Sequence, residues 1–137
     1  MKKLVVLFFG LLLFSTAFAQ EAADVTVKDG PKIVFSETTH DFGDIEQGEK
    51  VNYTFAFTNE GTQPLILSNV LTTCGCTATD WPRDPVAPSE GGTIAVTFNS
   101  AGKMGKQNKV ITVVSNAVNS QERVSIVTNV LPKGETK

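Results

Sequence analysis

The sequence predicts an all-β protein, an immunoglobulin-like β-sandwich of two sheets and about seven strands. Three observations lead to this fold class. Large apolar residues alternate with polar ones over short segments, as in a strand with one buried face. Turn-forming residues separate these segments roughly every 8–15 residues. No segment beyond residue 32 repeats its apolar residues at helical spacing. A closed barrel is the alternative arrangement for such strands.

The N-terminal segment is predicted to be a secretory signal peptide. Lys2 and Lys3 give a basic start, and residues 4–14 form an apolar run. Ala17 and Ala19 occupy the positions that a signal peptidase recognises. The run is shorter than the about 20 residues of a membrane span, and no cysteine follows it to carry a lipid. We therefore expect cleavage after Ala19, no membrane span in the mature chain, and a periplasmic or extracellular location.

The mature chain is long enough for one domain with a single core and too short for two. Loss of Lys2 and Lys3 leaves 10 basic against 14 acidic residues. No basic surface is expected, so nucleic acid is a poor candidate partner. The expected organisation is a signal peptide over 1–19, a flexible leader over 20–31, the sandwich domain over 32–132 and a polar tail over 133–137.

The first half of the domain contains the clearest strand. Strands are expected over 32–36 and over 39–45, the second of them kinked at Gly43. In the segment 51–58 every second residue is large and apolar or aromatic, which predicts one face on a core and one in water. The residues of the buried face are Val51, Tyr53, Phe55 and Phe57.

The second half of the domain begins with a strand over 65–71, which runs into the only two cysteines of the chain. Three prolines between 82 and 88 exclude a helix after the cysteines and allow at most edge pairing. Three further strands are expected over 93–99, 109–115 and 123–131, with a glycine-containing hairpin loop at 100–105.

Cys74-Gly75-Cys76 is the stretch whose side chains could react chemically as well as pack. In an extended strand, residues i and i+2 project to the same side with Cα atoms about 6.5–7 Å apart, at the upper limit for a disulfide. Gly75 can bend and shorten that distance, and export would provide an oxidising compartment. A disulfide between Cys74 and Cys76 is therefore feasible.

Three roles for the cysteine pair stay open. The first is structural, as a link or as two small packed residues. The second is thiol–disulfide exchange, although no thioredoxin-like pattern surrounds the pair. No basic residue is close in sequence to stabilise a thiolate, but Arg83 or Lys103 could approach in space. The third is binding of a soft metal, for which Cu(I) suits two thiolates.

His40 and Trp81 are the other residues considered for a site. His40 precedes Asp41, which suggests acid–base chemistry, but a lone histidine beside an aspartate is more often a structural pair. Trp81 and His40 are candidate recognition residues, although a lone Trp beside Pro82 more often caps a core. No motif for a catalytic nucleophile, metalloprotease, P-loop or dinucleotide site occurs. We therefore expect no enzyme, no cofactor and no bound metal.

Several short motifs together resemble one protein family. They are Phe35, His40-Asp41-Phe42-Gly43, Phe55-x-Phe57-Thr58-Asn59, Pro64-Leu65, Cys74-Gly75-Cys76-Thr77, Gly102-Lys103 and Ser115-Asn116. In order and spacing they resemble the small secreted bacterial proteins of "domain of unknown function 1573", common in Bacteroidetes. That family is similar to the Hydin-like (ASH) and major-sperm-protein-like immunoglobulin domains. The resemblance implies the sandwich fold and no particular activity.

The favoured function is an exported, non-enzymatic immunoglobulin-like module for binding or assembly. A complete sandwich pattern without a catalytic constellation motivates this hypothesis, and the expected partner is a protein of the cell envelope. The alternative is a redox or Cu(I)-handling protein that acts through Cys74 and Cys76.

Overall fold

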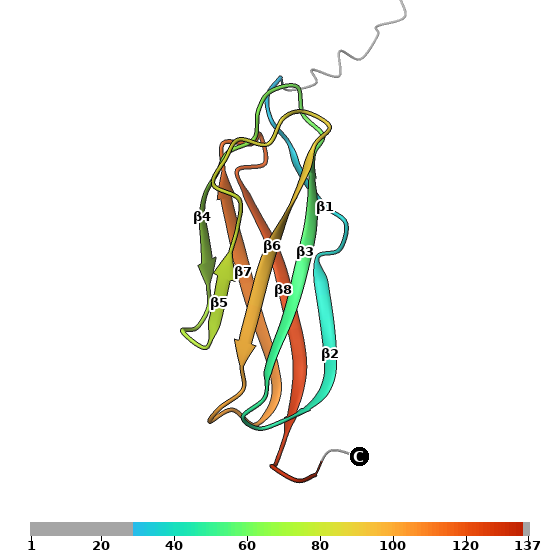
Figure 1. Ribbon diagram of the computed structural model, residues 1–137, viewed down its shortest axis with the longest axis vertical. Coiled ribbons are helices and arrows are strands. Elements are labelled where there is room, and N and C mark those ends of the chain that lie inside the picture. Colours follow the sequence, from blue (N-terminus) through green and yellow to red (C-terminus); the bar gives the residue numbers. More distant parts are fainter. Residues whose placement is uncertain (1–28, 136–137) are drawn as a thin grey trace, which may run out of the picture.

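The computed structural model describes residues 29–135 and builds them into two stacked sheets of four strands each, with no helix among these residues (Figure 1). In chain order the strands are β1 (Ile33–Phe35), β2 (Thr39–Glu46), β3 (Lys50–Asn59), β4 (Leu67–Thr72), β5 (Thr77–Asp80), β6 (Gly91–Asn99), β7 (Gly105–Ser115) and β8 (Gln121–Leu131). The two-sheet sandwich expected from the sequence is confirmed.

The strand order leaves the sandwich with two margins. Sheet A has the order β1-β3-β6-β5, and sheet B has the order β2-β8-β7-β4. Neighbouring strands pair antiparallel except β2 and β8, which run parallel. One margin, the β2–β3 margin, lies where β2 of sheet B runs beside β3 of sheet A. The other, the β4–β5 margin, lies where the two edge strands β4 and β5 meet (Figure 1).

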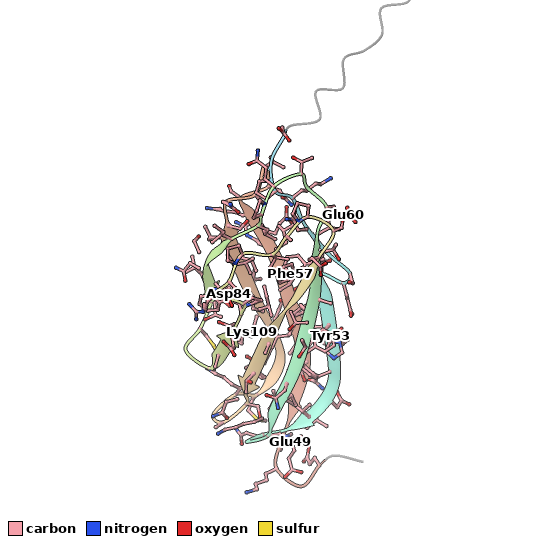
Figure 2. The ribbon with its side chains drawn as sticks, turned by 45° about the horizontal axis from the view of Figure 1, so that its top comes forward. Glu49, Tyr53, Phe57, Glu60, Asp84 and Lys109 are labelled. Carbon is pink, nitrogen blue, oxygen red and sulfur yellow. A yellow bond between two sulfur atoms is a disulfide. The ribbon has the colours of Figure 1, made fainter. Side chains whose placement is uncertain are left out.

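The core consists of the alternating apolar faces that the sequence predicted. Phe55 and Phe57 of β3 are 1% and 2% exposed, and Phe98 of β6 is fully buried. Intervening residues such as Thr54 face water. Each buried side chain of this size contributes roughly 1.5–3 kcal/mol. Apolar burial between the sheets therefore accounts for most of the stabilisation. Glu49 and Glu60 mark opposite ends of the sandwich (Figure 2).

One end of the sandwich is organised by Asn59, which is fully buried. Its Oδ1 accepts the N–H groups of Lys32 and Gly61 at 3.2 and 3.0 Å. Its Nδ2 donates to the carbonyls of Gln63 and Val86 at 2.7 and 2.9 Å. Because all four hydrogen-bonding positions of the amide are occupied, burial leaves no polar group unpaired.

The opposite end is organised by Ser100, also fully buried. Its hydroxyl donates to the carbonyl of Glu49 at 2.7 Å and accepts the N–H of Gly48 at 3.0 Å. This ties the β2–β3 turn to the loop between β6 and β7. Both ends of the domain are therefore held by satisfied polar side chains.

The structure has one strand more than the seven expected. The additional strand, β5, pairs with β6 at the edge of sheet A, where the sequence analysis allowed edge pairing at most. It is short because Pro82 follows and lacks a backbone N–H for the ladder. The predicted kink in β2 is confirmed: Gly43 has a φ of 69°, and the register to β8 shifts between Asp41 and Asp44.

The predicted signal peptide and most of the predicted leader lie outside the described residues. The described part of the leader is bonded to the domain, since Gly30 accepts the N–H of Thr62 at 2.9 Å and Pro31 accepts that of Val118 at 2.8 Å. Within residues 29–135, no helix has the length and apolar character needed to cross a membrane.

Candidate functional site

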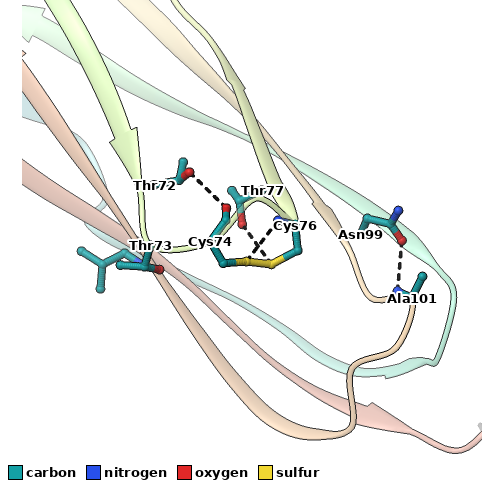
Figure 3. The surroundings of a disulfide bond; sticks show 8 residues. Thr72, Thr73, Cys74, Cys76, Thr77, Asn99 and Ala101 are labelled. Carbon is teal, nitrogen blue, oxygen red and sulfur yellow. Dashed lines mark hydrogen bonds between the residues drawn. A yellow bond between two sulfur atoms is a disulfide. The ribbon is translucent and has the colours of Figure 1, made fainter.

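The cysteine motif forms the turn at the β4–β5 margin. Cys74 and Cys76 are joined by a disulfide, with Cα atoms 5.3 Å apart (Figure 3). This separation lies within the usual range for a disulfide and is shorter than that of an extended strand. The N–H of Thr77 donates to the carbonyl of Cys74 at 3.3 Å, which is the hydrogen bond of a four-residue turn. The bend inferred from the sequence therefore brings the sulfurs together.

Gly75 is not required by packing. A Cβ at this position would meet nothing within 4 Å, and the residue has no positive φ. Gly75 is exposed, and the two cysteines beside it are half-buried. The disulfide turn therefore lies at the surface, at the edge of the two sheets.

The disulfide closes a very short loop, so it restricts the unfolded chain only slightly. Loop closure over three residues gives only about 1.6 kcal/mol, while the adjoining strands are already held by their ladders. Asn99 donates its N–H to the carbonyl of Cys76 at 2.9 Å, and the hydroxyl of Thr72 donates to the carbonyl of Cys74 at 3.2 Å. These hydrogen bonds hold the turn independently of the sulfur bond.

The two sulfurs have different surroundings, although both residues are half-buried. The Cys74 sulfur accepts the N–H of Cys76 at 3.2 Å. The Cys76 sulfur lies 4.0 Å from the hydroxyl of Thr77, and Cys76 packs against the apolar core. A backbone N–H directed at a sulfur stabilises negative charge on it. Cys74 is therefore better placed than Cys76 to carry a thiolate.

Lys109 is the residue that the sequence analysis missed. It is half-buried and lies on the inward face of β7, because the buried residues Ile111 and Val113 follow it at period two. Its Nζ lies 5.9 Å from the ring centroid of Phe98 on the opposite sheet. Within residues 29–135, no carboxylate pairs with Lys109. The alternation in β7 could have shown that this cation faces inward.

The pairing of β4 with β7 brings the start of the cysteine turn close to the β7 segment that contains Lys109. Thr72 is the last paired residue of β4, and the N–H of Val110 donates to the hydroxyl of Thr73 at 3.4 Å, so Thr73 lies beside Val110. Lys109 Nζ also lies 5.9 Å from the ring centroid of Phe98, which pairs with Thr77 just after the cysteines. A cation and a disulfide therefore share the β4–β5 margin.

Trp81 closes the same margin. It is half-buried and packs against the core, which agrees with the capping role considered from the sequence. The Arg83 guanidinium carbon lies 3.7 Å from the centroid of the indole, so Arg83 stacks on Trp81. The indole Nε1 is buried without a hydrogen-bond partner. The ring therefore acts mainly through apolar contact and its cation–π pair.

His40 lies at the other margin, away from the cysteines. Its ring stacks on Tyr53, with centroids 3.6 Å apart and planes inclined by 8°, and meets the edge of Phe42 at 4.7 Å. The Tyr53 hydroxyl donates to Glu37 at 2.5 Å, and His40 Nδ1 lies 3.9 Å from the same carboxylate. The hydrogen bond to Glu37 raises the pKa of Tyr53. This cluster joins β2 of sheet B to β3 of sheet A.

The pairing of His40 with Asp41 suggested by their adjacency is not formed. The Asp41 carboxylate instead accepts the N–H of Gly43 at 2.7 Å, because successive residues of a strand project to opposite sides. A polar hollow of about 460 Å³ lies beside this bulge, lined in part by Asp41, Asp44 and Lys106. Asp44 accepts a hydrogen bond from Asn129 at 2.8 Å. Both aspartates of the hollow thus have partners within the chain.

The outer edge of β4 is open. β4 pairs with β7 on one side and with no other strand among the described residues. Its residues include no charge and no proline. Leu71 is 51% exposed and Ile66, just before the strand, is 43% exposed. The N–H of Val70 donates to the side chain of Asn69 at 2.9 Å.

The other edge strands carry features that discourage strand addition. β1 has three residues, β5 has four and ends at Asp80 before a proline, and β2 is bulged at Gly43. Short length, charge, proline and bulges are the usual protections of a sheet edge. β4 has a register shift near its start, between Leu67 and Asn69, but none of the charges or prolines that protect an edge.

Topology and margins together define an immunoglobulin-like domain with a disulfide turn between two edge strands. Within the described residues, no group of three His, Cys, Asp or Glu side chains gathers to hold a metal. The chain belongs to the family described as "Protein of unknown function (DUF1573)", whose model matches residues 33–130. The family resemblance stated from the sequence is thereby confirmed. No curated protein matched the chain by sequence.

Solved structures with similar folds confirm the immunoglobulin-like class. A protein of unknown function from Porphyromonas gingivalis W83 superposes with a TM-score of 0.65 at 16% identity, covering 80% of this chain and 51% of that one. The ASH/PapD-like domain 7 of human CEP192 gives 0.57 at 14% identity, covering 74% and 86%. The VesB protease of Vibrio cholerae gives 0.57 at 12% identity, covering 72% and 31%. The chain thus spans about half of the Porphyromonas protein and a third of the protease, and these likenesses show the fold alone.

Proposed function

We propose that this protein is an exported, non-enzymatic immunoglobulin-like module that binds a protein partner of the cell envelope by strand addition at β4. The observation that carries the proposal is the open edge of β4, which has no charge or proline and ends beside the exposed Leu71. An extended peptide added to such an edge gains main-chain hydrogen bonds, and its alternate side chains contact the sheet surface.

The chemistry of the partner segment follows from the surface next to β4. On the outer face of sheet B, Leu71 lies beside Thr112 of β7, and Val110 and Val114 flank Thr112 along that strand. These β7 residues are half-buried and uncharged. An added strand would continue this surface, so its alternate residues are expected to be β-branched or aliphatic. The backbone of the same segment would take over the N–H of Val70 from Asn69.

A photo-crosslinking amino acid at position 71 tests the proposal in envelope extract. The matched control is position 54, because Thr54 is exposed on the outer face of sheet A. We expect one discrete adduct from position 71 and none at the same mass from position 54. Unlabelled wild-type protein should compete for that adduct, whereas Leu71→Lys protein should not. Identical adducts from both positions, or equal competition by Leu71→Lys, would contradict docking at β4.

Export is tested separately on protein from the native cell. We expect a mature N-terminus at Gln20 and recovery from the periplasmic fraction or the medium. A chain that retains Met1 in the cytoplasmic fraction would contradict the exported location.

A further inference from the structure

We propose that the Cys74–Cys76 disulfide is a reducible couple that accepts two electrons from a protein dithiol, with Cys74 as the leaving thiolate and Lys109 as the positioning cation. This activity goes beyond strand addition and does not require the β4 edge. It rests on the exposed turn, the hydrogen bond to the Cys74 sulfur, and the place of Lys109 on β7 next to Val110, which is bonded to Thr73.

The first step is attack at Cys76. A thiolate of the partner bonds to the Cys76 sulfur, the bond between Cys76 and Cys74 breaks, and its electron pair leaves on Cys74. That charge develops on the sulfur that accepts the N–H of Cys76, on a turn whose Thr73 hydroxyl accepts the N–H of Val110, the residue after Lys109. A thiol exchange is faster when the leaving sulfur is the better stabilised thiolate, so this direction of cleavage is preferred.

The second step completes the exchange. The second thiolate of the partner attacks its own sulfur in the mixed disulfide, and Cys76 leaves as a thiolate. The partner is oxidised to a disulfide, while Cys74 and Cys76 are reduced and take up the two protons that the partner released. A monothiol can perform the first step alone, which makes glutathione a suitable probe.

The inward position of Lys109 is otherwise unexplained. Lys109 is half-buried, and within residues 29–135 its Nζ lies 5.9 Å from the centroid of the Phe98 ring and pairs with no carboxylate. Lys106, on the same strand, is exposed. A cation beside the disulfide turn, with no carboxylate to neutralise it, stabilises a thiolate there.

A Cu(I) site is the competing use of the same sulfurs. The disulfide offers no thiolate to a metal. After reduction the pair would supply two ligands, without a gathered third His, Cys, Asp or Glu among the described residues. Exchange requires only the two sulfurs and the cation that the margin already contains.

The test compares the folded wild-type protein with Lys109→Met and with the control Lys106→Met. Each is incubated with excess glutathione, samples are quenched at timed intervals with a larger excess of maleimide, and the modified cysteines are located by mass spectrometry. We expect glutathione on Cys76 and maleimide on Cys74. The reduction rate should fall about threefold to tenfold in Lys109→Met and stay within twofold of wild type in Lys106→Met. Urea unfolding of each variant verifies that it is folded.

Three results would overturn the proposal. One is a folded wild-type disulfide that glutathione does not reduce, as for a structural bond. Another is glutathione found predominantly on Cys74. The third is an equal reduction rate in Lys109→Met and wild type. Leu71→Lys should leave the rate unchanged, so failure of docking at β4 and failure of exchange are distinguishable.

Discussion

At the β2–β3 margin two rings from different sheets stack on each other, whereas at the β4–β5 margin a disulfide turn, a lysine and a tryptophan fill the gap. The first margin contains the only histidine and the only tyrosine of the chain, and the second contains both cysteines and the only tryptophan. The rare residues of this protein therefore lie where the two sheets come to an edge.

The two margins differ in whether their polar groups have hydrogen-bond or ion-pair partners within the protein. At the β2–β3 margin, the Tyr53 hydroxyl and the His40 ring both turn to Glu37, so the polar groups have partners. At the β4–β5 margin, Lys109 pairs with no described carboxylate and the Trp81 Nε1 has no hydrogen-bond partner. Satisfied polar clusters stabilise a fold, while unsatisfied ones are more often retained for a function. This contrast favours the β4–β5 margin as the place where chemistry occurs.

Truncation of Trp81 is expected to have the largest effect. Trp81→Ala removes an indole that packs on the core and should lower the free energy of unfolding by about 2–3 kcal/mol, less than for a fully buried aromatic residue. Urea unfolding followed by circular dichroism measures this loss. Trp81→Phe should cost about 1 kcal/mol, because the indole N–H has no partner to lose. A loss below about 1 kcal/mol in Trp81→Ala would show that the tryptophan does not close the margin.

Removal of the disulfide is expected to have a smaller effect. The double variant Cys74→Ala, Cys76→Ala should lose at most about 1.6 kcal/mol, because the closed loop is so short. The hydrogen bonds that Thr72 and Asn99 make to the turn remain. The same urea titration, compared with wild type in the oxidised state, measures the difference. A loss above about 3 kcal/mol would show that the disulfide is mainly structural. It would then stabilise the fold at least as much as Trp81 does.

Local alternation was sufficient to predict the fold. The buried faces of 51–58 and 93–99 follow from period two alone, and Gly75 indicated the bend that joins Cys74 to Cys76. β5 was not counted as a strand because the prolines after it dominate the local pattern. Its four residues pair because β6 is adjacent, and that adjacency is a property of the whole topology.

The composition of the margins could be predicted only in part. Lys109 occupies an inward position of an expected strand, so the direction of its side chain could be predicted, but its place near the cysteine turn depends on how β4 pairs with β7. His40 was associated with Asp41 because they are adjacent, although the same period-two rule places their side chains on opposite sides. Contacts between residues close together in the chain, such as Cys74 and Cys76, could be predicted from the sequence. Contacts between strands could not, because they depend on how the strands pair.

The smallest expected effect is a pH dependence at the β2–β3 margin. The pKa of Tyr53 is raised above its ordinary value of 10.0, first by its hydrogen bond to Glu37. Because the folded protein favours the neutral phenol, this contribution to stability is complete below pH 10 and is lost as the pH rises through the raised pKa. Tyr53 is the only tyrosine of the chain, so phenolate absorbance reports it alone. We expect a midpoint above pH 10 in wild type and a lower one in Glu37→Gln, with no change in the double cysteine variant. An equal midpoint in Glu37→Gln and wild type would mean that Glu37 does not hold the phenol, and the two margins would then differ less than their geometry indicates.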